Sequence, residues 1–170
     1  CGMMNPLMEH GIYFIGTYEW EALGESAVPF LLKLLKNPCS IVRRSAVISL
    51  GRIALDGNVK QALTKMYNDS EDIAGLAKIA VKRIDAVSSG NRRIHFNYID
   101  SHIYSRPDLN SEKESLKKCT GVIVLEWHIP SPSGEEGPRG GVQIYDRIQV
   151  VDNGMTGFMP RTGYDESILI

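Results

Sequence analysis

Apolar residues between positions 28 and 84 recur at the three- and four-residue spacing of amphipathic helices. The first such stretch carries Val28, Leu31, Leu32 and Leu35 on one face. Polar breaks at 37–40 and 68–72 separate the periodic stretches, and Pro29 suits a first helical turn. The pattern predicts two helix pairs, with Leu32, Leu50, Leu63 and Val81 buried. The pairs are Val28–Lys36 with Ile41–Ala54, and Val59–Tyr67 with Ile73–Ile84.

The two helix pairs are similar in sequence to each other. When Val28 is written above Val59, the remaining positions of both pairs align without a gap, so that Leu50 falls on Val81 and Arg52 on Arg83. Self-similarity at a fixed period is the signature of a repeat protein, in which each unit buries its apolar face against its neighbours. We therefore expect a tandem helical repeat.

The repeat has a recognisable motif. Ala27–Leu35, followed by Ile41–Ala46 and Ser49–Ile53, resembles the short HEAT repeats that also occur in phycobilin lyases. The resemblance extends over about Ala22–Asp85. It implies an α-solenoid that recognises proteins along a groove. Some members of that family bind DNA, and some serve enzymes as subunits.

The second half of the chain has the pattern of β-strands. Val122–Ile129 is rich in β-branched and apolar residues, and Val142, Ile144, Ile148 and Val150 alternate with polar positions. Asp152-Asn153-Gly154 is a tight-turn signal. We expect an α+β chain: a short HEAT-like α-solenoid over 1–88, then a linker and a small antiparallel β hairpin or sheet over 89–170, packed on the solenoid.

Composition narrows the partner classes. The net charge of −1 supplies no general attraction for nucleic acid, so a nucleic-acid partner is not expected. No run of about 18 apolar residues occurs, so the sequence predicts no transmembrane helix. The resemblance to HEAT repeats implies another protein as the partner.

Charged and aromatic residues supply the candidate binding surface. Tryptophans are favoured anchors of protein interfaces, and a basic stripe on the second helix of each pair could hold an acidic segment. The competing interpretation is that these cations are solvated or brace turns. The candidate partner-binding residues are Trp20, Arg43, Arg44, Arg52, Lys78, Lys82, Arg83 and Trp127.

Metal and cofactor chemistry has little support in the sequence. His95, Asp100 and His102 are the best metal-ligand types, with Glu126 and His128 further on. Their spacing matches no zinc or two-metal signature, and scattered surface residues are the simpler interpretation. We expect no catalytic residues, no metal and no cofactor.

The three cysteines leave two questions open. Cys39 and Cys119 could form a disulfide or remain two reduced thiols. Cys1, followed by Gly2, resembles the acylated start of a mature bacterial lipoprotein, which would place the protein in the cell envelope, attached to a membrane only through that lipid. An arbitrary first residue explains Cys1 equally simply, and the protein would then be cytoplasmic.

Taken together, these features predict a protein-binding or scaffold module that uses the groove of a HEAT-like solenoid, either as an envelope lipoprotein or in the cytoplasm. The first alternative is an accessory or catalytic subunit of a phycobilin-lyase-like enzyme. A second alternative is a nucleic-acid binder, which the net charge disfavours.

Overall fold

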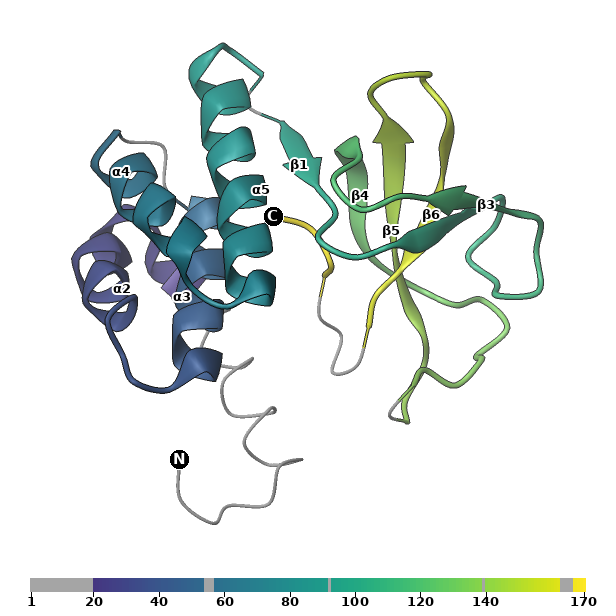
Figure 1. The fold of residues 1–170 in the computed structure, drawn as a ribbon. Coiled ribbons are helices and arrows are strands. Elements are labelled where there is room, and N and C mark those ends of the chain that lie inside the picture. Colours follow the sequence, from purple (N-terminus) through teal and green to yellow (C-terminus); the bar gives the residue numbers. More distant parts are fainter. Residues whose placement is uncertain (1–19, 54–56, 92, 139, 163–166) are drawn as a thin grey trace. The chain divides into compact units, whose positions relative to one another are not determined.

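The structure is a computed structural model that describes residues 20–53, 57–91, 93–138, 140–162 and 167–170 (Figure 1). The chain forms two compact units. One comprises residues 1–92 together with Ile170, and the other comprises residues 93–169. The first unit is helical and the second is built on a β-sheet.

The helical unit contains two helical hairpins. The short 3-10 turn η1 (Gly24–Ala27) leads into α2 (Val28–Leu34), which is followed by α3 (Ser40–Ile53). The second hairpin consists of α4 (Gly57–Lys65), the 3-10 turn η2 (Met66–Asn68) and α5 (Glu71–Ser88). These helices lie where the apolar periodicity predicts them, and Pro29 occupies the first turn of α2.

The core of the helical unit lies between α3 and α5, whose mutual packing is the most extensive among these helices. Leu50, Leu63 and Val81 are buried, as predicted, but Leu32 is only half-buried. Leu31 and Leu35, which belong to the same predicted apolar face, are the buried residues of this segment. The predicted face is therefore present, but its centre lies at Leu31 and Leu35 and Leu32 is at its edge.

Small residues allow α3 and α5 to approach closely. A Cβ atom added to Gly51 on α3 would lie 2.7 Å from the Ala80 Cβ on α5 and 2.5 Å from Cγ2 of Ile170. Glycine and alanine at this crossing are therefore required by the short distance between the helices. The fully buried Ile170 completes this contact.

The second unit is a curled six-stranded antiparallel sheet (Figure 1). The strands have the spatial order β1-β4-β5-β6-β2-β3. They are β1 (Ile94–Phe96), β2 (Ser101–Tyr104), β3 (Lys113–Leu116), β4 (Gly121–Pro130), β5 (Ile144–Val150) and β6 (Thr156–Pro160). The core of this sheet includes Val122, Tyr145, Ile148 and Met159, all at most 1% exposed.

The tight turn predicted at Asp152–Gly154 is confirmed. β5 and β6 pair in antiparallel fashion on either side of it, with Gln149 opposite Thr156. The backbone of Gly154 has φ +73°, a conformation that glycine adopts without the steric cost that other residues meet.

The predicted fold class is wrong in two respects. The described helices form two hairpins and not a helical solenoid, and the second half is a curled six-stranded sheet, larger than the small hairpin or sheet that was expected. Two helix pairs provide too few repeats to build a continuous groove. The sheet was underestimated because β1, β2 and β3 are three or four residues long, too short to show a clear alternation of apolar and polar residues.

Candidate functional site

The arginines of the helical unit make extensive intramolecular contacts. Arg43 donates to both carboxylate oxygens of Asp69, at 2.7 and 2.8 Å, and also to the backbone oxygens of Asn37 and Pro38. The hydrogen bonds from Arg43 lower the pKa of Asp69, and those bonds raise the pKa of Arg43. This pair ties the start of α3 to the turn before α5.

The other candidate cations are engaged in similar ways. Arg44 pairs with Asp72 at 3.0 Å and Arg52 with Glu21 at 2.8 Å. Arg83 is buried and donates to the backbone oxygens of Gly51 and Arg52, and its burial lowers its pKa. Lys78 lies over the ring of Tyr67, and Lys82 is exposed. These contacts fit turn-bracing residues, and partner binding by them stays a prediction.

Trp20 is half-buried at the edge of the helical unit. Its ring stacks on that of Phe30 with centroids 6.3 Å apart, and the neighbouring Leu23 is exposed. Cys1 lies outside the described residues, so the predicted lipid site is not tested. In the described part of the chain, Cys39 and Cys119 are half-buried and do not form the disulfide that the sequence left open.

The weak metal candidates are spread over the second unit. His95 lies on β1 and His102 on β2, where its ring is near that of Tyr104. The Asp100 carboxylate accepts the backbone N–H of Lys118 at 2.6 Å. Among the residues that the structure describes, no three His, Cys, Asp or Glu side chains are grouped so that they could hold a metal ion.

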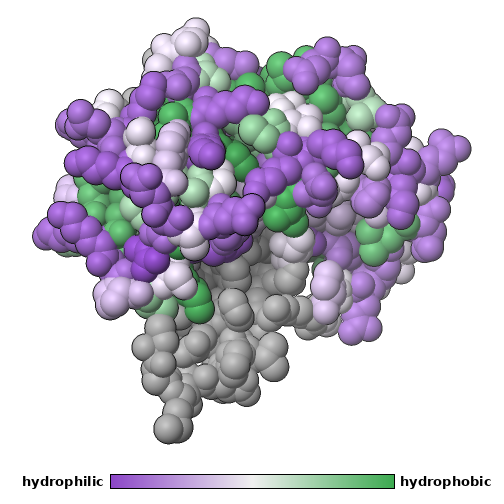
Figure 2. Space-filling view, in the orientation of Figure 1, coloured by the Kyte–Doolittle hydropathy of each residue, from purple (hydrophilic) through white to green (hydrophobic). Residues whose placement is uncertain are grey.

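No helix within the described ranges combines the length and the apolar character that crossing a bilayer requires. Figure 2 shows one face of the surface, on which hydrophilic residues predominate and hydrophobic residues occur in small scattered groups. Singly exposed apolar side chains of this kind are ordinary. An exposed apolar side chain is therefore a candidate contact residue only where contacts with neighbouring residues fix it in an exposed position.

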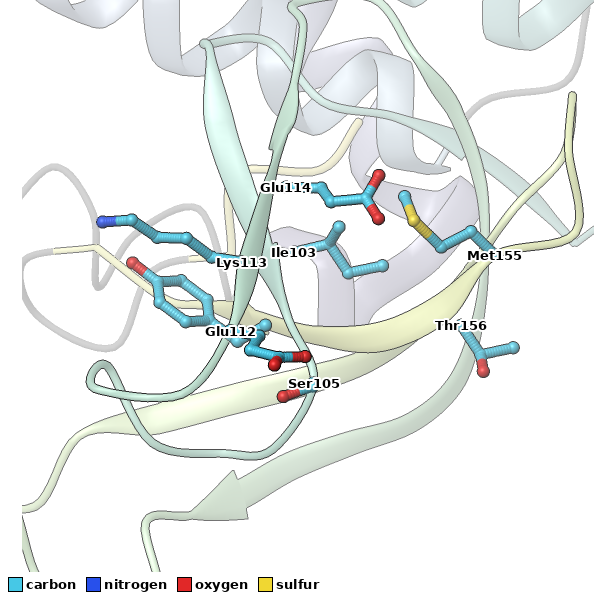
Figure 3. A pocket seen from close by; sticks show the side chains of 8 residues that line it. Ile103, Ser105, Glu112, Lys113, Glu114, Met155 and Thr156 are labelled. Atoms are coloured by element: carbon cyan, nitrogen blue, oxygen red, sulfur yellow. The ribbon is translucent and has the colours of Figure 1, made fainter.

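A cavity of about 330 Å³ lies beside β2, β3 and the start of β6 (Figure 3). Glu112 directly precedes β3, and Lys113 and Glu114 are its first two residues, so their side chains lie on opposite faces. The ammonium group of Lys113 lies over the Tyr104 ring. Figure 3 shows the Glu114 carboxylate beside Ile103 and Met155. Both carboxylates are exposed and solvated, so the hollow does not single out a ligand.

The second half of β4 is the more informative surface. Between residues 93 and 138, β1 pairs with β4 only from Gly121 to Ile123, so the outer edge of β4 continues beyond its neighbour. Leu125 and Trp127 are 47% and 44% exposed, and Glu126 and His128 between and after them are exposed too. We refer to Leu125–His128 as the Trp127 platform.

The platform is a bulged segment of the strand. The register of β4 against β5 shifts between Val124 and Glu126, and again between Glu126 and Ile129. In addition, His128 has φ +60°, a left-handed conformation that is strained for a residue with a side chain. Bulges re-aim side chains and concentrate near functional sites, and strained residues do the same.

A buried ion pair lies directly beneath the platform. Asp146 on β5 is fully buried, and Arg161, just after β6, is 4% exposed. The Arg161 Nε and Nη2 atoms donate to Asp146 Oδ1, both at 2.9 Å. The same Oδ1 accepts the backbone N–H of His128 at 3.2 Å. The pair thus connects three segments of the sheet unit.

The rings of the platform rest on this pair. The guanidinium carbon of Arg161 lies 5.7 Å from the centre of the Trp127 ring, within cation–π range. Arg161 Nη1 lies 2.9 Å from Nε2 of His128. On another side, His95 meets the Trp127 ring edge-on at 5.6 Å.

Comparison of the chain with known protein families, with curated proteins and with solved structures finds no match. The candidate site therefore depends on its own geometry.

The sequence identified Trp127 as an anchor but missed Asp146 and Arg161. One signal was present. Ile144, Ile148 and Val150 occupy the apolar phase of β5, and Asp146 lies in that same phase. A lone carboxylate at an inward-facing position indicates a buried, paired charge. Arg161 follows a proline in an irregular stretch, where no periodicity marks a residue as buried.

Proposed function

We propose that the protein is a protein-binding module whose contact surface is centred on the Trp127 platform. The observation that supports this most directly is a tryptophan nearly half-exposed on a bulged strand, with its ring in contact with both Arg161 and His95. Tryptophan and arginine dominate the energetics of protein interfaces, and a tryptophan that is already ordered loses little entropy on binding.

The shape of the surface favours a macromolecular partner. The platform is made of consecutive exposed residues along a strand edge, whereas small-molecule sites enclose most of the ligand's surface. Leu125 adds apolar area beside Trp127, and Glu126 and His128 add polar groups that set specificity. The proposal replaces the solenoid groove with the sheet unit as the binding surface.

The test is quantitative affinity capture from the native cell with three baits: the wild-type chain, Trp127→Ala, and Leu109→Ala as the matched control. Leu109 is an apolar residue of the same unit, 39% exposed, and it lies outside the platform. We expect a protein that both wild type and Leu109→Ala retain and that Trp127→Ala loses.

The Kd of the purified partner for each variant then gives the contribution of Trp127 to binding. An anchor residue contributes about 2 kcal/mol or more, so Trp127→Ala should weaken Kd by a factor of about 30, and Leu109→Ala by less than about twofold. If every captured protein binds the Trp127→Ala bait as well as it binds wild type, the proposal is wrong.

Attachment to a membrane through a lipid on Cys1 stays a separate prediction. Mass spectrometry of the N-terminal peptide of the native protein tests it: an acylated Cys1 is expected, and an unmodified cysteine in a peptide that extends upstream would contradict it.

A further inference from the structure

We infer that the buried Asp146–Arg161 pair is a positioning device, which fixes the β4 bulge and thereby sets the orientation of Trp127. This inference rests on the proposed function, because it explains how the binding surface is held ready for a partner. Neither residue belongs to the Trp127 platform itself. Both act through the residues that they hold.

The Asp146 carboxylate accepts a hydrogen bond from the backbone of the bulge. Glu126 pairs with Arg147 and Ile129 with Tyr145, so three steps along β4 face two along β5. The extra residue interrupts the regular ladder of hydrogen bonds. Asp146 lies between Arg147 and Tyr145, and its Oδ1 accepts the N–H of His128. A side chain of β5 thus binds a backbone N–H at the point where the register of the ladder shifts.

Arg161 extends the same connection to both rings of the platform. Its Nε and Nη2 atoms bind Asp146, its Nη1 atom approaches the His128 ring, and its plane lies near Trp127. The backbone of Arg161 is fixed as well. Its N–H donates to the oxygen of Ile144, and its own oxygen accepts from the buried side chain of Gln143. A rigid guanidinium therefore supports Trp127 and His128 from below.

Stability alone does not account for this pair. Asp146 and Arg161 are 0% and 3% exposed at their side chains, and both charges must leave water when the chain folds. Apolar residues of similar volume often stabilise such a position equally well, because the desolvation of two charges offsets most of their attraction. In some proteins, buried polar or ionic groups instead specify one conformation among several. The conformation specified here is the bulge.

The strain at His128 supports this interpretation. A residue with a Cβ atom holds φ near +60° only where its surroundings over-determine the conformation. Two contacts do so at His128: its N–H to Asp146 and its ring to Arg161. Without the pair, the strand is expected to relax toward a regular conformation. Trp127 would then move away from its support.

The test uses the full chain carrying Trp20→Phe, so that Trp127 is the one remaining tryptophan of the two in the sequence. Three variants are compared in this background. Asp146→Leu combined with Arg161→Met replaces the charges by apolar groups, and Arg161→Lys keeps the charge but not the planar fork. Ile148→Val perturbs the core of β5 and leaves both members of the pair in place. The readouts are the urea midpoint, the emission and acrylamide quenching of Trp127, and amide exchange at His128.

We expect the double variant to unfold near the wild-type midpoint, while its Trp127 emission changes and the His128 amide exchanges at least tenfold faster. Arg161→Lys should show a partial change in both signals. Ile148→Val should lower the midpoint and leave both signals as in wild type. Partner binding should weaken in parallel with the Trp127 signal.

The inference fails if the double variant, or Arg161→Lys where the double variant does not fold, keeps the wild-type emission and His128 exchange. These signals are recorded on the chain without its partner. They therefore test positioning even if Trp127→Ala binds partners normally, a result that would defeat the proposed function alone.

Discussion

At the scale of single residues, two aspartate–arginine pairs show how burial changes the role of the same chemistry. Asp69 and Arg43 are 14% and 20% exposed at their side chains and join a turn to a helix, where the charges remain partly solvated. Asp146 and Arg161 are buried beneath the Trp127 platform. The first pair contributes to stability in a way that depends on pH, whereas the second is proposed to fix a conformation.

The Asp69–Arg43 pair leads to a prediction about acid stability. The hydrogen bonds from Arg43 lower the pKa of Asp69 below its ordinary value of 3.8. A depressed carboxyl pKa stabilises the fold above the unfolded-state pKa, and this stabilisation is lost as the pH falls through the folded-state pKa. Asp69→Asn should therefore lower the free energy of unfolding at pH 7, and its curve should converge with that of wild type as the pH falls through the folded-state pKa of Asp69.

Urea unfolding between pH 2.5 and pH 7 measures both curves. Asp72→Asn is the control, because Asp72 is 62% exposed and its pair with Arg44 is a surface ion pair of small energy. A constant difference between wild type and Asp69→Asn over this whole range would contradict the assignment.

At the scale of elements, one glycine determines how closely β2 and β6 approach. A Cβ atom added to Gly157 would lie 2.6 Å from the backbone oxygen of Tyr104 and 2.6 Å from Cγ1 of Ile103. The neighbouring strand therefore has to move if this glycine is replaced. This contact secures the two-stranded β2–β3 part of the sheet to its centre, where Tyr104 pairs with Phe158.

Gly157→Ala is accordingly expected to destabilise the sheet unit by about 1–3 kcal/mol through overpacking. Gly137→Ala is the matched control, since its added Cβ would meet its nearest neighbours at an ordinary 3.5 Å. Thermal unfolding followed by near-ultraviolet circular dichroism compares the two. Equal melting temperatures for Gly157→Ala and wild type would refute the close approach.

Local patterns predicted some elements and not others for a physical reason. The helices from Val28 to Ser88 and the turn at Asp152–Gly154 depend on neighbours in sequence, so periodicity and turn chemistry are sufficient. The pairing of β6 with the short β2 depends on residues far apart in the chain. The Trp127 platform also depends on residues that are far apart in the chain. Trp127 was visible as an aromatic residue, but the bulge and its support by Arg161 arise from the register between strands.

At the scale of the whole molecule, the chain has two cores of different construction. The helical core includes Leu50 and Leu63, and the sheet core includes Val122 and Ile148. The sequence predicted a small hairpin or sheet that depends on the helices, because an isolated hairpin is marginal. Six strands with their own buried residues change that expectation.

A fragment of residues 93–169 is therefore expected to fold by itself, because it contains the whole sheet and its core. A cooperative thermal transition and a dispersed proton spectrum would support independent folding. A fragment that gives the spectrum of an unfolded chain would show that the sheet unit requires the rest of the molecule.

The most direct test of the central claim is fluorescence of the Trp20→Phe chain during titration with the protein partner isolated by affinity capture. Trp127 is then the single tryptophan reporter of the chain, and it is 44% exposed before binding. If the Trp127 platform is the contact surface, its emission should move to shorter wavelength and acrylamide quenching should fall, both saturating at the stoichiometry of the complex. An unchanged Trp127 signal, while sedimentation shows that the complex has formed, would contradict the account.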